Sequence, residues 1–365
     1  MNAYDLPPRW RLPLLLLGMV SLLLGVFAGL ARLGVAAPEL AQARAGHHGA
    51  LMVAAFFGTV ISLERAVALH RLWPYLAPLA AGLGGLAMIA DAPWWLPPTL
   101  LTAASGLFVA ANVGVYRQLP ALFTLTLLLG AIAWLAGNLL WLAEGGLSTA
   151  ALPWMAFLVL TIAGERLELT RFLPPQPLAP PLFRAILLLA VAATALTPWF
   201  PASASRLLAA AWLALAAWLL RYDIARQTVR QRDLTRFVAV CLLGGYVWLA
   251  IGALLGLGGA FLPGHSGRDA ALHAVFLGFV FSMVIGHAPI IFPAVMRVRI
   301  PYHPVFYLPL AALHLALAVR LLGSFSANTG WQQTGAALNA LSLALFILTL
   351  LFSVVRGAIT KEPAQ

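Results

Sequence analysis

Four of the eight histidines lie in contexts that indicate chemistry. His47 and His48 begin one strongly apolar segment, His273 begins another, and His287 lies deeper in the segment that His273 begins. Ionisable groups inside a bilayer cost at least a few kcal/mol near its centre, so they are candidates for function. A neutral imidazole ligates iron, copper or zinc through a ring nitrogen. The histidines therefore direct attention to haem or metal chemistry.

His48 and His273 are expected to enter the membrane from the same side and to lie at similar depth. Two neutral imidazoles at equal depth on facing helices can ligate one haem iron from opposite faces. The sequence thus predicts a haem between the second and tenth helices, with His48 and His273 as axial ligands and His47 as an adjacent candidate. The alternative is that each histidine is a hydrogen-bonded interface residue.

A second group of polar side chains lies near the opposite, inner side. The segments "TVISLERAVALHR" and "TIAGERLELTR" place Glu64-Arg65 and Glu165-Arg166 at similar depth, and His287 has the corresponding depth in the tenth helix. Histidine and carboxylate ligands suit iron or zinc. Glu64, Glu165 and His287 are therefore a candidate second haem, metal (iron, copper or zinc) or proton-handling site. The alternative is a pair of inter-helical ion pairs at the cytoplasmic boundary.

Ideal α-helical winding gives these residues expected positions. His273 and His287 share a face within about 40° and are about 21 Å apart along the axis. Glu64 lies about 24 Å deeper than His48 but about 160° away in azimuth, which argues against one face serving both sites. The motif "GHAPIIFP" predicts a kink in the tenth helix, because a proline lacks the N–H that its helix position requires.

Composition identifies the environment of these residues. The chain of 365 residues is 62% hydrophobic and 9% charged, against about 25% charged in soluble domains. It is predicted to be an all-α polytopic membrane protein of about twelve spans, since a span needs about 20 apolar residues. The predicted spans are 12–34, 47–69, 73–91, 96–116, 120–143, 149–170, 181–200, 205–221, 235–262, 270–296, 304–323 and 332–355.

The basic residues set the expected orientation. Of 22 Lys and Arg, 17 fall at inner ends and loops and 5 at outer ones when the N-terminus is inside. This bias predicts cytoplasmic N- and C-termini. The net charge of +11 is spread over short loops, so no nucleic-acid partner is expected; the lipid bilayer is.

The Glu-Arg pairs and His287 recur every four helices. This interval suggests a single transmembrane domain, 1–365, built from three four-helix units at 1–118, 119–232 and 233–365. Chance similarity between apolar segments is the alternative. Cys241 is the one cysteine, so neither a disulfide nor a thiolate metal site is expected.

Two motifs carry a family resemblance. "HGALM" (from His48 to Met52), followed by Phe56 and Phe57, resembles the second-helix pattern of the haem-copper oxidase catalytic subunit, in which the histidine ligates a low-spin haem. "HAVFLGFVFSM", which begins at His273, resembles the tenth helix of the NnrS family, twelve-helix haem proteins connected with nitric oxide tolerance. The resemblance implies a redox or nitric-oxide-related haem protein, with an electron-donor protein or quinol and a small gaseous ligand as partners. It also implies the inner membrane of a bacterium or archaeon.

The sequence departs from both families. The predicted sixth and seventh helices contain no histidine, so the oxygen-reducing copper centre of the oxidases is expected to be absent. The NnrS pattern has two histidines separated by one residue, whereas His47 and His48 are adjacent. Respiratory or nitric-oxide-related oxidoreductase activity is thus left open. A proton-coupled secondary transporter without cofactor and a noncatalytic subunit that anchors a redox partner are the competing functions.

Overall fold

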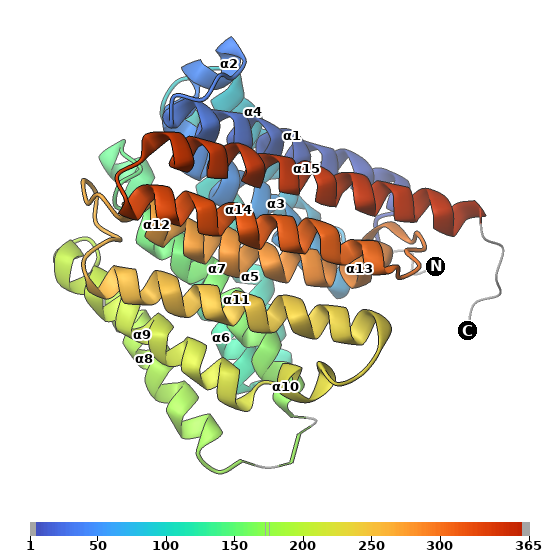
Figure 1. The fold of residues 1–365 in the computed structure, drawn as a ribbon. Coiled ribbons are helices and arrows are strands. Elements are labelled where there is room, and N and C mark those ends of the chain that lie inside the picture. Colours follow the sequence, from blue (N-terminus) through green and yellow to red (C-terminus); the bar gives the residue numbers. More distant parts are fainter. Residues whose placement is uncertain (1–4, 172, 175, 360–365) are drawn as a thin grey trace. The chain divides into compact units, whose positions relative to one another are not determined.

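The computed structural model describes residues 5–171, 173–174 and 176–359, and within them every regular element is a helix (Figure 1). Ten of these helices are long and apolar enough to cross a membrane. The prediction of an all-α polytopic membrane protein is therefore confirmed. Both extreme ends, which carry the predicted cytoplasmic termini, lie outside the described residues.

Two of the twelve predicted spans differ from the other ten. The helical segment Trp73–Ile89 is shorter than a full span, and α7 (Ala151–Thr170) carries three charged residues, Glu165, Arg166 and Glu168, near its end. Both segments are helical, so their existence was predicted. A count of twelve crossings stays a prediction.

The chain forms two compact units, the first made of residues 1–168 and 190–204. Its elements are α1 (Pro8–Arg32), α2 (Glu39–Ala43), η1 (Ala45–His47), η2 (Ala50–Phe57), α3 (Gly58–Leu69), η3 (Trp73–Tyr75), α4 (Leu76–Ile89), α5 (Leu96–Gln118), α6 (Leu122–Glu144) and most of α7. Helix α1 packs against η2 and α4, and α5 packs against α4 and α6. In the core, Trp134 stacks on Phe157 with ring centroids 5.1 Å apart.

The second unit contains residues 169–189 and 205–365. It holds α10 (Ala225–Thr228), α11 (Asp233–Leu257), α12 (Arg268–His273), η4 (Ala274–Phe281), α13 (Ser282–Met296), η5 (Pro304–Phe306), α14 (Tyr307–Phe325) and α15 (Thr329–Ile359). Helices α8 (Ala179–Leu196) and α9 (Pro201–Tyr222) are divided between the units. Helices α14 and α15 pack along each other, and η4 packs against α11. The predicted three-unit organisation at 118 and 232 stays a prediction.

Glycines bring three pairs of helices close together, and in each pair the two spans follow one another in the chain. The positions are Gly18 and Gly25 on α1, Gly130 and Gly137 on α6, and Gly245 and Gly252 on α11. A Cβ at any of them would come within 3.3 Å of an atom of the following span. Small residues allow membrane helices to approach closely. The seven-residue glycine spacing thus recurs at the same four-helix interval as the Glu-Arg motif.

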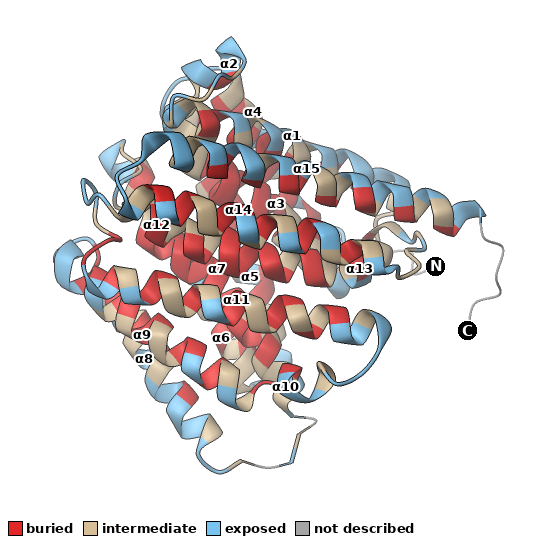
Figure 2. Cartoon of the chain, in the orientation of Figure 1, coloured by how far each residue is buried: buried red, intermediate tan, exposed pale blue. Residues whose placement is uncertain are grey.

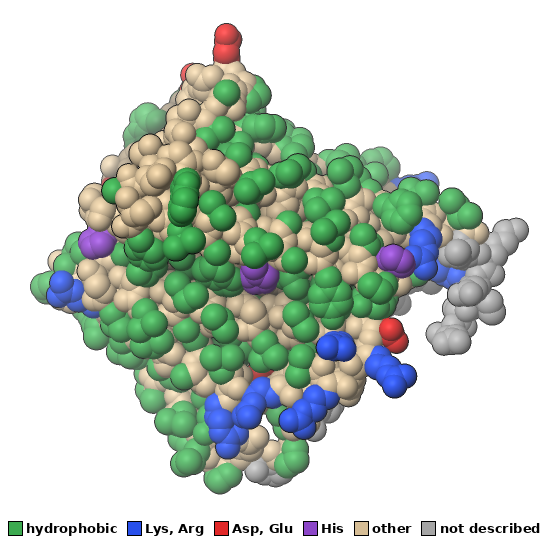
Figure 3. Space-filling model, in the orientation of Figure 1, with side chains coloured by type: hydrophobic (Ala, Val, Ile, Leu, Met, Phe, Trp, Pro, Cys, Tyr) green, Lys and Arg blue, Asp and Glu red, His purple; other side chains and the backbone are tan. Residues whose placement is uncertain are grey.

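The surface agrees with a lipid environment. Long helices have buried side chains on one side and exposed ones on the other (Figure 2). Large apolar side chains such as Leu188 and Leu315 are about 70% exposed, and hydrophobic side chains are spread over the face drawn in Figure 3. Exposed apolar area of this extent is unfavourable in water, so lipid is the expected neighbour.

Candidate functional site

His48 is held by the neighbouring helix α1. Its Nδ1 lies 2.7 Å from the carbonyl oxygen of Gly25. A carbonyl only accepts, so Nδ1 carries the proton and the lone pair of the neutral ring is on Nε2. The ring lies over Gly29, where a Cβ would come within 2.6 Å of Cε1. The glycine therefore makes the space that the imidazole occupies.

His47 has a different environment from its neighbour. Its Nδ1 is buried without a hydrogen-bond partner. Burial lowers the pKa of His47, and the positive charge of Arg44 lowers it further, although Asp91 partly offsets both. Arg44 itself pairs with Asp91 at 3.1 Å. His47 is consequently a neutral imidazole at pH 7.

His273 lies at the end of α12 and has the same tautomer as His48. Its Nδ1 is 2.7 Å from the carbonyl oxygen of Asp269, one helical turn earlier, and 3.2 Å from Oδ1 of the same residue. Both oxygens accept, so Nδ1 donates and Nε2 holds the lone pair. Of the predicted site histidines, His273 alone has a carboxylate among the Nδ1 contacts described here.

The segments that follow both histidines are π-helices. They are η2, beginning two residues after His48, and η4, beginning directly after His273. Sequence periodicity predicted continuous α-helices there. π-Helical winding is rare and is frequent at functional sites. The same irregularity after both candidate ligands is a feature that composition did not reveal.

π-Helical winding changes the azimuths that are expected from α-helical winding. A π-helix has i→i+5 bonds and more residues per turn, and if each segment acts as one inserted residue the azimuth beyond it shifts by about 100°. Glu64 then lies about 60° from His48, while His287 moves to about 140° from His273. Helix α13 continues through Pro289 and Pro293, so the irregular winding lies before the prolines. The expected angles assumed α winding throughout, which the chain does not have.

The carboxylates of Glu64 and Glu165, both predicted to lie near the inner side, are near each other in the first unit. Glu64 on α3 and Glu165 on α7 lie close enough for their charges to repel each other, and Arg65 and Arg166 offset that repulsion. Both acids are half-buried. The sequence predicted only that the two acids lie at similar depth. In the structure, α7 places Glu165 near Glu64.

His287 lies on α13 in the second unit. Its Nδ1 donates to the carbonyl of Met283 at 2.8 Å. Among the described residues, no group of three or more His, Cys, Asp or Glu side chains is arranged to hold a metal ion. The metal role of Glu64, Glu165 and His287 stays a prediction.

His314 illustrates a histidine with a structural role. Its Nδ1 accepts a hydrogen bond from Trp248 Nε1 at 2.5 Å, and Ser282 Oγ lies 3.5 Å from Nε2. These partners come from α11 and α13, so the imidazole joins three helices of the second unit.

Two polar clusters were missed by sequence reasoning. In the second unit, Arg320 and Gln332 converge on Asp269. In the first, Asp5 pairs with Arg11 at 2.8 Å and accepts from Tyr75 at 2.8 Å. The available signal was an arginine within or beside an apolar span, which requires a partner. The sequence could not name that partner.

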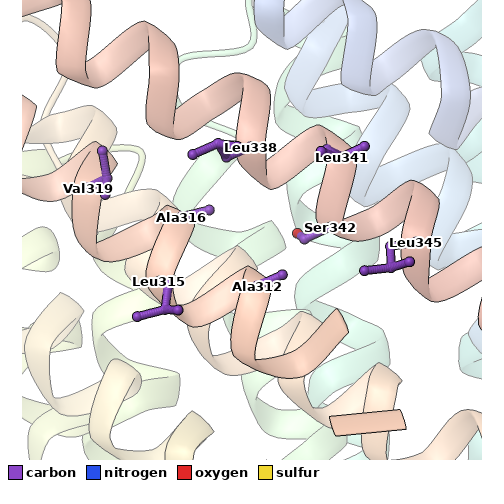
Figure 4. Close-up of a pocket in the computed structure, with 8 residues that line it drawn as sticks. All are labelled: Ala312, Leu315, Ala316, Val319, Leu338, Leu341, Ser342 and Leu345. Carbon is purple, nitrogen blue, oxygen red and sulfur yellow. The ribbon is translucent and has the colours of Figure 1, made fainter. Parts of the chain in front are cut away.

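A groove between α14 and α15 is apolar and lacks chemistry of its own (Figure 4). It has a volume of about 230 Å³ and Ser342 is its one hydroxyl-bearing residue. Leu315, Leu338 and Leu341 line it. Its composition suits contact with lipid chains rather than catalysis.

Comparison with known proteins gives one family. Residues 11–355 match the family described as Domain of unknown function (DUF8744). The chain belongs to the DUF8744 family. No curated protein matches this DUF8744 chain. The family description names no ligand, and the resemblance to NnrS and haem-copper oxidases stays a prediction.

Proposed function

We propose that this protein binds a b-type haem in the membrane, with His48 and His273 as its axial ligands. The observation that carries the proposal is the shared tautomer of the two residues. Each donates Nδ1–H to a main-chain carbonyl at 2.7 Å, which leaves the Nε2 lone pair as the ligating group. Metal-ligating histidines ordinarily donate their other ring N–H in this way.

The surroundings of the two histidines fit the group. Both rings are half-buried, and the residues that follow them, such as Leu51 and Val275, are fully buried. Apolar packing excludes water and lowers the local dielectric, which tunes a haem. When bound, the haem would supply one-electron transfer or, with one ligand released, binding of a small gas such as nitric oxide.

The proposal extends to partners and location through the family resemblance. An electron-donor protein or quinol is the proposed redox partner, and the cytoplasmic membrane of a bacterium or archaeon is the proposed location. His47 is a reserve candidate ligand, and Glu64, Glu165 and His287 are candidates for a second haem, a metal or proton handling. Respiratory or nitric-oxide-related oxidoreductase activity would follow from such a haem.

A visible spectrum tests the central claim. Protein purified from haem-replete cells is expected to have a Soret band that His48→Ala and His273→Ala each remove. The matched control is His265→Ala, because His265 is exposed and lies in the loop before α12, the helix that carries His273. A colourless wild-type preparation, or a Soret band that survives both substitutions, would overturn the assignment.

A proton-coupled transporter is the second candidate, and the Glu64–Glu165 proximity favours it. Paired carboxylates inside membrane helices are usual in proton relays. For this function, the wild-type protein should be free of haem and should carry a proton flux in vesicles. Loss of that flux in Glu64→Gln and in Glu165→Gln would support it. Metal analysis of Glu64→Gln and His287→Ala tests the inner metal: unchanged metal content in both removes it.

A further inference from the structure

Asp269 is the centre of a polar cluster in the second unit. Arg320 holds its carboxylate bidentately, with Nε 2.8 Å from Oδ2 and Nη2 2.7 Å from Oδ1. Gln332 Nε2 donates to Oδ2 at 3.2 Å. His273 Nδ1 lies 3.2 Å from Oδ1. One carboxylate thus links α12, α14 and α15 and lies against the ring nitrogen of His273.

The packing of α14 and α15 fixes this cluster. A Cβ at Gly335 would come within 2.4 Å of the backbone nitrogen of Arg320, and one at Gly323 within 2.3 Å of that of Gln332. The two helices therefore touch along their backbones where both donors leave them. The Arg320 side chain is 8% exposed and that of Asp269 is 22% exposed. A planar guanidinium in this geometry orients the carboxylate strongly.

The charge of Asp269 acts on His273. The Nδ1–H of His273 donates to the main-chain carbonyl of Asp269 at 2.7 Å, and the negative carboxylate of the same residue lies beside that N–H at 3.2 Å. A carboxylate beside Nδ1–H makes the imidazole a stronger donor at Nε2. Arg320 tempers this effect because it shares the same negative charge. The Nδ1 contact found for His48 is instead with the neutral carbonyl of Gly25.

We infer that Asp269 is a positioning residue that holds His273 as the Nδ1–H tautomer and strengthens it as an iron ligand, with Arg320 and Gln332 keeping the carboxylate in place. The inference rests on the proposed haem function. It assigns to the carboxylate a specific consequence, stabilisation of ferric over ferrous haem, because a more electron-donating imidazole favours the higher charge.

The test is the midpoint potential of the purified haem protein. Asp269→Asn keeps the size of the side chain and removes its charge, so the ferric preference is expected to fall about tenfold, an upward shift of ~59 mV for a one-electron couple. Asp269→Glu is expected to restore most of the wild-type potential. The matched control is Asp91→Asn, which removes an acid paired with Arg44 in the first unit and is expected to leave the potential unchanged.

Because Asp269→Asn leaves Arg320 buried without its ion pair, Asp269→Asn/Arg320→Gln is the second variant. It removes both charges and retains amide hydrogen bonds, and a potential above wild type in it supports the inference. If the midpoint potentials of Asp269→Asn and of Asp269→Asn/Arg320→Gln both equal that of Asp91→Asn, the inference is overturned while the haem assignment stays intact.

A haem-independent readout separates the two claims. In wild-type protein labelled with ¹⁵N-histidine, His273 is expected as the Nδ1–H tautomer, with an Nδ1 proton that shifts in Asp269→Asn and not in Asp91→Asn. A preparation without haem defeats the proposed function alone. An Nε2–H tautomer, or an unshifted Nδ1 proton, defeats the positioning role.

Discussion

The imidazole of His48 lies directly over Gly29, at a place where a methyl group would come within 2.6 Å of the ring. Helix α1 thus contributes both the carbonyl that fixes the tautomer and the space that receives the ring. The orientation of His48 is therefore a property of two helices rather than of the motif that contains it.

Gly29→Ala is expected to displace the ring and lower haem retention about tenfold, the effect of losing a supporting contact of a metal ligand. Haem-to-protein ratio after purification measures it. Gly46→Ala is the matched control, since a Cβ at Gly46 meets no atom within 4 Å. Equal ratios in the two variants would contradict the proposed orientation of His48.

The lowered pKa of His47 predicts that the first unit loses stability as the pH falls. The folded pKa of this histidine is below the ordinary 6.5 because of burial and Arg44, so between these two values the unfolded chain binds more protons. Stability is then lost as the pH falls through this window, by at most ~1.4 kcal/mol per pH unit. The melting temperatures measured at pH 7.5 and at pH 5.5 should differ less for His47→Asn than for wild type. His265→Asn, at an exposed position, should behave as wild type; an undiminished difference in His47→Asn refutes the prediction.

Asp5 should stabilise the first unit through its ion pair with Arg11. Arg11, 1% exposed, pairs with it, and removing one partner of a buried ion pair costs roughly 3 kcal/mol. We expect Asp5→Asn to lower the free energy of unfolding by that order, measured by denaturant titration in detergent. Asp91→Asn breaks an ion pair whose acid is 73% exposed, and the expected loss is at most ~1 kcal/mol. Equal losses would contradict the prediction.

The stability that the Asp5 cluster contributes depends on pH. Burial alone would raise the pKa of Asp5, but hydrogen bonds from Tyr75 and His70 and the charge of Arg11 outweigh it, and the pKa is lowered from 3.8. The stabilisation is fully present above 3.8 and is lost as the pH falls through the folded pKa. Acid unfolding below pH 4 should therefore be less steep in Asp5→Asn; a profile identical to wild type would exclude this role.

The Trp248–His314 hydrogen bond should be worth about 1 kcal/mol, because Trp248→Phe removes the donor to the half-buried imidazole of His314. Thermal unfolding of the purified protein measures the loss. Trp199→Phe, at a side chain that is 72% exposed, should leave the melting temperature unchanged. A Trp248→Phe variant as stable as Trp199→Phe would show that the bond contributes nothing.

The predicted orientation can be tested with single cysteines, because the natural Cys241 is buried. Ser266→Cys, in the loop before α12, should react with an impermeant maleimide in intact cells. Gln231→Cys, in the loop before α11, should react only after lysis. The reverse pattern would place the N-terminus outside.

The candidate site was predicted in part. The sequence identified His48, His273, His287, Glu64 and Glu165, because ionisable residues stand out in apolar segments. It missed Asp269, Arg320 and Gln332, which lie on three elements and meet only through the packing of α12, α14 and α15. It also missed the π-helices, since a π-helix has the same apolar composition as an α-helix and differs only in its hydrogen-bond register.

The amino-acid sequence by itself determined that this protein is helical and membrane-spanning, because a chain that is 62% hydrophobic and 9% charged must satisfy its backbone hydrogen bonds within each span. For His48, tertiary structure decided which imidazole nitrogen carries the proton. Gly25 belongs to a different helix from His48, and the carboxylate of Asp269 is held by residues more than 50 positions away. The tautomer of His48 depends on the position of the Gly25 carbonyl oxygen, and the packing of α1 beside His48 sets that position.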